Sequence, residues 1–412
     1  MKEQTLFNKN FTLVVLGQII SLFGNAILRF ALPLYLLRTT GSPTLFGIVT
    51  ACSFLPMTIL SFLGGVLADR LNKRNIMVTL DFLTALIILI LYIVLGKVSV
   101  VPLFILVLMI LYGISGTYQP TVQASIPSLV SEEKILSAGA IINQVNALSN
   151  LLGPVIGGML FGSFGITPIL IISIVCFVVS AIMELFIDIP HVRRNDNMGV
   201  LSIVKNDLFE SIHYMKNEKP MLIKAIALIS MFNLVLTAMI IVGLPIIFVD
   251  VLGVNDSLLG ISQGMVAFGG LCGGILTAIL GTKLKVKNSH YLLFLCSVSV
   301  FFMGLPILLK LSVNSSYILI TVFSVLIMIF ATMFSIQIIA MVQTETPPHL
   351  VGKVIACMMA FSMCSQPIGQ ALYGFLFDKL HNNSYVILFI VSIISCTIAL
   401  VSKKIFSSFH NA

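Results

Sequence analysis

Charge is what this sequence has least of. Asp, Glu, Lys and Arg make up only 9% of its 412 residues, whereas a soluble domain carries about 25%. Hydrophobic residues make up 58%, and the mean hydropathy is +1.11. A chain this apolar could not stay monomeric in water, so its solvent must be lipid.

Motifs for catalysis and metal binding are also missing. The seven cysteines form no CxxC pair and all lie in apolar runs, so we interpret them as packing residues. The sequence contains no GxxxxGK[ST] phosphate-binding loop and no HExxH zinc motif. We therefore expect a protein that is not an enzyme and that needs no metal or cofactor.

Twelve long apolar runs dominate the chain. Runs of about 17–25 residues with little charge predict membrane-spanning helices, and the alternating ten-residue segments of a membrane β-barrel are missing. The runs lie near 11–37, 44–68, 76–95, 99–121, 135–161, 166–187, 221–249, 257–282, 290–309, 315–342, 353–377 and 384–402. We expect an all-α membrane protein with twelve transmembrane helices in two six-helix bundles, residues 1–187 and 221–412.

A polar segment, residues 188–220, separates the two expected bundles. Part of it, near 200–216, has apolar residues at helical spacing: Leu201, Val204, Leu208, Ile212 and Met215. It is either an amphipathic helix on the inner membrane surface or a plain linker between the bundles.

The distribution of positive charge predicts the orientation. With the N-terminus inside the cell, about eighteen of the 23 Lys and Arg fall on the inside and about four outside, as the positive-inside rule expects. We therefore expect both termini in the cytoplasm and the chain in the cell membrane. The net charge of +8 is then a topology signal, and we expect no nucleic-acid partner.

Two stretches of the chain resemble each other. "ALPLYLLRTTG" (31–41) matches "GLPIIFVDVLG" (243–253), and "GGVL" (64–67) matches "GGIL" (273–276) at nearly the same offset. A weaker match joins 153–160 to 366–373. These matches predict a duplicated six-helix half, an arrangement in which two halves rock about a central site.

The segment "GGVLADRLNKRN" (64–75) contains an unusual cluster of charged residues: Asp69, Arg70, Lys73 and Arg74. It resembles the loop between helices 2 and 3 of the major facilitator superfamily, G-x-L-A-D-R-x-G-R/K-R/K. The departure at Asn72 is mild, because Asn tolerates a left-handed backbone best after Gly. The resemblance implies that these four residues form a conformational switch; the alternative is a basic loop that only sets topology.

Two narrower resemblances concern function. Residues 21–51 look like the macrolide-efflux branch of drug exporters. The fifth run contains "GPVIGG", with Gly153, Pro154, Gly157 and Gly158, and resembles the antiporter signature G-x8-G-x3-G-P-x2-G-G with its first two glycines replaced by Ala140 and Ser149. The resemblance implies that this helix acts as a flexible hinge and that the protein transports its substrate outward. The alternative is that the small residues only allow close helix packing.

Polar residues inside the membrane are costly, so they point to function. In the first run, Gln18, Ser21, Asn25 and Arg29 are spaced three, four and four residues apart, which places them on one helix face. Arg29 either faces a cavity or reaches the outer headgroups. Further candidates for a substrate cavity are Tyr112, Gln119, Asn143, Asn146, Asn150, Asn233, Gln366 and Gln370.

No carboxylate lies near a predicted midplane. By elimination, Asp81 and Glu184 are the candidates for proton coupling, although both lie toward helix ends. We expect a secondary active transporter that exports hydrophobic drugs such as macrolides by alternating access, driven by protons and acting as a monomer in the bilayer. Two alternatives are a carrier of an anionic or lipid-like molecule anchored by Arg29 and a membrane protein that does not transport.

Overall fold

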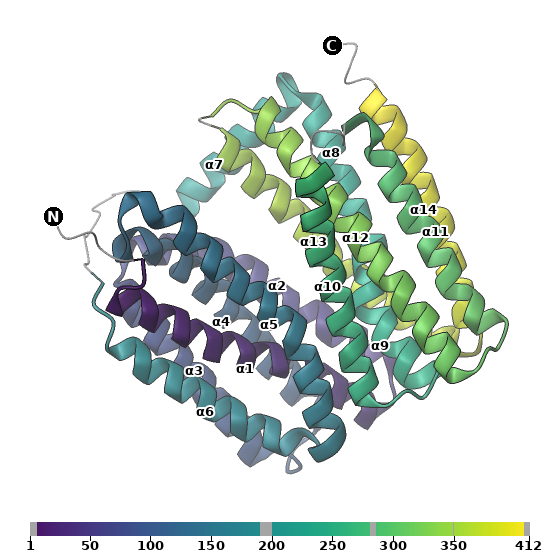
Figure 1. The fold of residues 1–412 in the computed structure, drawn as a ribbon, viewed down its shortest axis with the longest axis horizontal. Helices are drawn as coiled ribbons and strands as arrows, with labels where there is room; N and C mark the ends of the chain where they lie inside the picture. Colours follow the sequence, from purple (N-terminus) through teal and green to yellow (C-terminus); the bar gives the residue numbers. More distant parts are fainter. Residues whose placement is uncertain (1–5, 190–199, 281–285, 349, 408–412) are drawn as a thin grey trace. The chain divides into compact units, whose positions relative to one another are not determined.

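The computed structural model describes residues 6–189, 200–280, 286–348 and 350–407. The side chains of a few helical residues within these ranges, including 62–63, 65–66, 69–70 and 200–207, are not described. Over these ranges the structure is helical, without a strand (Figure 1). Twelve of its helical segments are long and apolar enough to cross a membrane, so the protein is a multi-pass membrane protein.

The first six spans are regular helices joined by short loops. They are α1 (Lys9–Thr40), α2 (Pro43–Arg70), α3 (Lys73–Val94), α4 (Val100–Leu129), α5 (Ile135–Phe164) and α6 (Ile166–Leu185). All six match predicted runs, although α4 continues about two turns past the predicted end at 121.

The second half begins with α7 (Val200–Asn217), which precedes six further spans. These contain α8 (Pro220–Phe232), α9 (Leu244–Ile246), α10 (Asp256–Leu280), α11 (Ser289–Leu308), α12 (Val313–Glu345), α13 (Val351–Lys379) and α14 (Ser384–Ser407). The predicted helix 221–249 differs from a regular helix. After α8 it widens into π-helical turns at Asn233–Thr237, Met239–Gly243 and Ile247–Val251.

Helix ends follow local side-chain chemistry. Asn72 caps α3, because its side-chain oxygen accepts hydrogen bonds from the backbone N–H of Arg74 (3.0 Å) and Asn75 (3.5 Å). Its φ of −68° is not left-handed, so the conformational reason given for its place in the motif was wrong. Capping of the following helix is the physical reason that Asn suits this position.

The matched glycines of the repeat share one conformation. Gly41, just after α1, has φ +58°, and Gly253, after the last π-helical turn, has φ +63°. A positive φ suits glycine because it lacks a Cβ, and helices commonly end on such a residue. The sequence repeat therefore corresponds to the same chain reversal in both halves.

The contacts divide the chain into two compact units. Unit 1 comprises Met1–Thr40, Cys52–Val200 and Asp256–Gly264, and unit 2 comprises Gly41–Ala51, Leu201–Asn255 and Met265–Ala412. In unit 1, α1 packs on α5 and α6, and α3 packs on α4 and α6. In unit 2, α11 packs on α12 and α14, and α13 packs on α8 and the π-helical segment.

Each unit takes one short segment from the other half of the sequence. The start of α2 belongs to unit 2, where a methyl group added at Gly47 would lie 2.8 Å from the Cα of Gly374. The start of α10 belongs to unit 1, where a methyl group added at Gly158 would lie 2.9 Å from the Cα of Gly260. The close approach of α2 to α13 and that of α5 to α10 therefore each depend on a pair of glycines.

The helix α7 is fixed to unit 2 by polar contacts. The Lys353 ammonium lies 2.6 Å from the Glu210 carboxylate, and the Tyr214 hydroxyl donates to the carbonyl of Glu345 at 3.1 Å. Among the predicted apolar residues with described side chains, Met215 is buried but Ile212 is 40% exposed. The buried face runs through Ser211, Tyr214 and Met215 instead, so this part of the helix is rotated from the predicted amphipathic face.

The expected orientation can be tested by cysteine accessibility in intact cells. In a cysteine-free background, Asn72→Cys, Val200→Cys and Val286→Cys should resist a membrane-impermeant maleimide added outside, whereas Val313→Cys should react. Permeabilising the cells should expose all four positions and serves as the control. Labelling of 72, 200 and 286 in intact cells, with 313 protected, would reverse the orientation.

Candidate functional site

The predicted polar stripe on α1 faces the interior of unit 1. Gln18 and Ser21 are buried, and Asn25 and Arg29 are partly buried. Their contacts come from α2, α3 and α4: Ser21 meets Asp81, Asn25 donates to the Ser115 hydroxyl at 2.7 Å, and Arg29 meets Met57. The stripe therefore joins four helices in one polar core.

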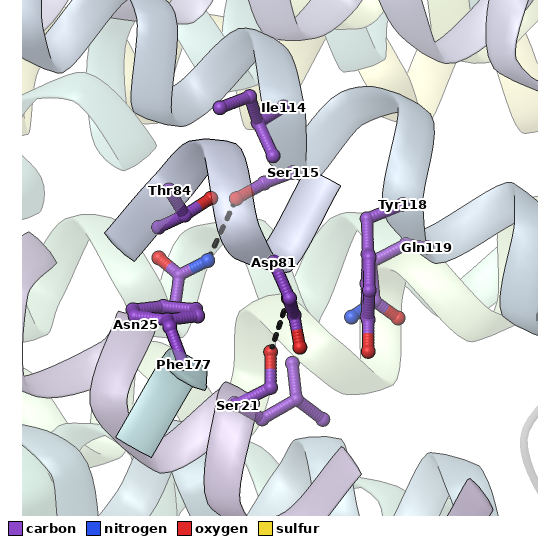
Figure 2. A pocket seen from close by; sticks show the side chains of 10 residues that line it. Ser21, Asn25, Asp81, Thr84, Ile114, Ser115, Tyr118, Gln119 and Phe177 are labelled. Atoms are coloured by element: carbon purple, nitrogen blue, oxygen red, sulfur yellow. Dashed lines mark hydrogen bonds between the residues drawn. The ribbon is translucent and has the colours of Figure 1, made fainter. Parts of the chain in front are cut away.

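Hydrogen bonds link both buried carboxylates to this stripe. The Gln18 amide donates to the Tyr118 hydroxyl at 2.9 Å, and that hydroxyl donates to Glu184 Oε1 at 2.5 Å. Ser21 Oγ donates to Asp81 Oδ1 at 3.2 Å, as Figure 2 shows. Asp81 lies about two turns into α3 and Glu184 at the end of α6. Thus α1 connects acidic groups from two different helices.

The two carboxylates are only half satisfied. Asp81 is 2% exposed and Glu184 is 1% exposed. Asp81 Oδ2, Glu184 Oε2 and Gln18 Oε1 have no hydrogen-bond partner in the part of the chain that the structure describes, and no described Lys, Arg or His pairs with either acid. Burying a charged carboxylate without a cation costs several kcal/mol. These acids therefore occupy a site that strongly favours a neutral group.

Tyr118 is the member of this network that the sequence did not single out. It follows Ser115 by three residues on α4, the spacing of one helix face, and it directly precedes the predicted cavity residue Gln119. Its hydroxyl both accepts from Gln18 and donates to Glu184. It is therefore the bridge between α1 and α6.

A small cavity lies beside Asp81. It is lined by Ser21, Leu22, Asn25, Asp81, Thr84, Ile114, Ser115, Tyr118, Gln119 and Phe177 (Figure 2). The space open to the centres of water molecules is about 10 Å³, which is roughly what a single water needs. Seven of the ten lining residues carry a polar group, so the site suits one water or a proton path and is too small for a drug.

Arg29 is held by an aromatic ring and a sulfur atom. Its guanidinium carbon lies 4.2 Å from the centre of the Tyr112 ring, and Nη2 lies 3.3 Å from Met57 Sδ. A cation over a ring face is stabilised by the ring quadrupole. Its Nε has no hydrogen-bond partner, and no carboxylate within the described ranges pairs with it. The cation therefore retains donors for a further partner.

The predicted polar residues of α5 form an exposed row. Asn143 and Asn150 are exposed and Asn146 is partly exposed. Asn146 donates to Gln119 Oε1 at 3.4 Å, and Asn143 accepts from Gln123 at 3.2 Å. Exposed amides inside a membrane span are costly against lipid. This face of unit 1 therefore fits a water-filled surface.

The predicted cavity residues of unit 2 are less exposed than the amides of α5. Asn233 stands at the first π-helical turn, donates to the carbonyl of Ser362 at 3.4 Å and accepts from the Thr237 hydroxyl at 2.9 Å. Gln366 and Gln370 are buried on α13. Neither amide atom of Gln370 has a partner among the residues that the structure describes.

The glycine run of α5 makes close helix contacts. Gly153 and Gly157 face α1, where a methyl group added at Gly157 would lie 3.2 Å from the Phe30 ring, and Gly158 faces α10. Helix α5 continues through Pro154 without a break. Close packing accounts for these glycines, and a switching role stays a prediction.

The charged segment 64–75 is described only in part. The backbone of Asp69 and Arg70 lies in α2, and their side chains fall outside the described residues. Lys73 begins α3, and Arg74 is partly buried with no partner for its Nε in the described structure. A search of the described residues finds no cluster of three or more His, Cys, Asp or Glu that could hold a metal ion.

Known proteins resemble this chain along nearly its whole length. Macrolide efflux protein A of Streptococcus pyogenes is 23% identical over 392 residues, 94% of each chain. Multidrug efflux pump Tap of Mycobacterium tuberculosis is 20% identical over 387 residues, 89% of this chain and 86% of the relative.

Solved structures share the fold at low identity. A D-xylose-proton symporter superposes with a TM-score of 0.71 at 13% identity, covering 95% of this chain and 96% of that one. A bacterial homologue of the iron transporter ferroportin superposes with a TM-score of 0.69 at 17% identity, covering 97% of this chain and all of that one. The family model of the Major Facilitator Superfamily matches residues 14–309. With that match, twelve membrane spans and this fold, the chain belongs to the major facilitator superfamily.

Proposed function

We propose that this protein is a monomeric secondary active transporter of the cell membrane that exports hydrophobic drugs, such as macrolides, in exchange for protons. Family membership supports transport over a role as a receptor or immunity factor. The names of relatives that are 20–23% identical, macrolide and multidrug efflux pumps, support drugs as cargo. The observation that carries the proton coupling is the half-satisfied pair Asp81 and Glu184.

A coupling group has to gain and lose a proton during each cycle. A proton on either acid removes the buried charge and turns an unpartnered oxygen into a donor. The cavity beside Asp81 has room for about one water, which provides a carrier for that proton. Loss of the proton restores a charge that hydrogen-bond donors such as Ser21 of α1 and Tyr118 of α4 can stabilise.

In this proposal the hydrogen-bond network also links protonation of the two acids to the cargo site. Ser21 and Gln18, which contact the acids directly or through Tyr118, share the helix face of Asn25 and Arg29. A change in hydrogen bonding at one end of α1 therefore acts on the whole stripe, because a helix transmits displacement along its axis. In this proposal the stripe, with Tyr112, Gln119 and the α5 amides Asn143, Asn146 and Asn150, forms the part of the cavity supplied by unit 1.

Switching between conformations is assigned to the elements that the sequence singled out. In the proposal Asp69, Arg70, Lys73 and Arg74 change ion-pair partners, while Gly153, Pro154, Gly157 and Gly158 let α5 slide against its neighbours. From unit 2, Asn233, Gln366 and Gln370 are proposed to face the cargo. The buried, unpartnered amide of Gln370 supports such a role, since it lacks a hydrogen bond that a ligand or a second conformation could supply.

Removing either acid should uncouple transport from the proton gradient. In inside-out membrane vesicles with an acidic interior, Asp81→Asn and Glu184→Gln should abolish accumulation of a labelled macrolide but preserve exchange of labelled for unlabelled drug. Glu133→Gln, which changes an exposed acid in the loop before α5, is the control and should accumulate drug normally. If both buried-site variants still concentrate drug, the coupling group lies elsewhere or the driving ion is not a proton.

Two tyrosines of unit 1 offer a matched pair of variants. Tyr118→Phe leaves Gln18 and Glu184 without their shared partner, so we expect a loss of stability of about 1–3 kcal/mol and a shifted pH profile of drug accumulation. Tyr92→Phe changes a tyrosine of α3 that is 40% exposed and lies outside the network, and it should change neither property. Thermal unfolding of the purified variants and transport measured against pH would check this; equal behaviour of the two variants would refute a bridging role for Tyr118.

A second candidate function rests on Arg29. Its guanidinium has an unpartnered Nε and no described carboxylate partner, and it is partly buried between α2 and α4. A cation in such a place favours a ligand that brings a carboxylate, a phosphate or several carbonyl groups. The protein could then carry an anionic or lipid-like molecule, with Arg29 as the anchor.

Substrate affinity of two Arg29 variants distinguishes these functions. For an anionic cargo, Arg29→Gln should weaken binding by about 1.5–3 kcal/mol, the value of a hydrogen bond to a charged group. Arg29→Lys should restore it only partly, because the planar fork is lost. For neutral drugs the effect should be small and differ between drugs. Unchanged affinity for every substrate, in folded protein, would place Arg29 outside the cargo site.

A further inference from the structure

A second hollow lies far along the chain from the polar core, in unit 2. It is a groove of about 370 Å³ between α8 and α14. It is lined by Lys224, Ala227, Leu228 and Met231 from α8 and by Ile394, Thr397, Ile398, Val401 and Ile405 from α14. The lining positions recur every three or four residues on each helix, so one face of each helix forms a wall of the groove.

The walls of the groove are apolar. Thr397 is the one hydroxyl among its lining residues, and it donates to the carbonyl of Ile393 at 3.0 Å. Its hydrogen is therefore satisfied within α14. Lys224 supplies the one charged group. The groove thus offers a long hydrocarbon surface and a single cationic group.

The cation stands at one end of the groove. Helix α8 begins at Pro220 and α14 ends at Ser407, and these two ends lie at the same end of unit 2 (Figure 1). From Ile405 to Ile394 the lining covers about 16 Å at 1.5 Å per residue. The hydrocarbon core of a bilayer is about 30 Å thick, so the groove has the depth of about one leaflet.

Positive charge gathers at that same end. Lys224 is exposed, and no described carboxylate lies within ion-pair distance of it. Lys403 and Lys404 lie on the last turns of α14 and are also exposed. A lysine near the membrane surface attracts an anionic lipid with about 1 kcal/mol. The charge and the apolar depth of the groove therefore match a phospholipid, headgroup and chain together.

We propose that this groove binds an anionic phospholipid, with one acyl chain along Leu228, Met231, Ile394 and Ile398 and the phosphate at Lys224. A lysine can lay its methylene stem on the apolar wall while its ammonium meets the headgroup. The residues of this site all belong to unit 2, and those of the polar core all belong to unit 1. It does not depend on which cargo the protein carries or on the coupling ion.

Native mass spectrometry of the detergent-purified full chain tests the site. Phosphatidylglycerol and phosphatidylcholine with identical acyl chains are titrated separately. The first phosphatidylglycerol molecule should bind with higher affinity than the first phosphatidylcholine molecule. Lys224→Gln should reduce that preference about fivefold, which corresponds to about 1 kcal/mol. Lys216→Gln, an exposed lysine of α7 outside the groove, is the matched control and should leave the preference unchanged.

A second variant tests the apolar part of the site. Ala227→Trp fills the groove and should remove the first tight lipid of either kind, with thermal unfolding showing that the protein is folded. Excess inorganic phosphate should not displace the lipid, since phosphate gains nothing from the apolar wall. Equal binding of both lipids, equal effects of the two lysine variants, retention of the lipid in Ala227→Trp, or its displacement by a macrolide would each overturn the proposal.

Discussion

Lipid offers no hydrogen bonds, and that constraint shapes every level of this structure. Each polar group inside a span must find its partner within the protein. The backbone meets the requirement by forming helices, and many hydroxyls among the described residues meet it within their own helix. Thr50, Thr84 and Ser115, for example, each donate to the carbonyl four residues back. Against that background, buried polar atoms without a partner are informative, and Asp81, Glu184 and Gln18 each hold one.

The two halves of the chain repeat their geometry and differ in their chemistry. Gly64 packs on α4, and its sequence counterpart Gly273 packs on α12, the fourth span of the second half. In the first half α3 and α6 carry the acids Asp81 and Glu184. The corresponding pair in the second half, α11 and α14, is joined by Ser297 and Ser392, each donating to the other's carbonyl. Duplicated architecture thus holds titratable groups in one copy and neutral hydroxyls in the other.

The sequence predicted the spans well because length and hydropathy alone define a helix in lipid. It also predicted the α1 stripe, since the spacing of Gln18, Ser21, Asn25 and Arg29 fixes a helix face. It could not predict that Tyr118 joins Gln18 to Glu184. Those residues are 100 and 66 positions apart from Tyr118, and helix packing alone brings them together.

Two other features could not be predicted from the sequence, for different reasons. The first two π-helical turns, Asn233–Thr237 and Met239–Gly243, pack on α13, and hydropathy does not distinguish them from an α-helix. Lys224 was overlooked because it lies inside an apolar run. It stands out only as the one charged residue among those that line the groove between α8 and α14.

The spans differ greatly in length, although one bilayer must hold them all. Helix α1 has 32 residues and α6 has 20, which gives lengths of about 48 Å and about 30 Å. A long span adapts to bilayer thickness by tilting, whereas a span of about 30 Å just matches the hydrocarbon core. Because Glu184 is the next-to-last residue of α6, membrane thickness sets the distance between this acid and the headgroup region. A thicker membrane draws it deeper into hydrocarbon, and a thinner one brings it toward interfacial water.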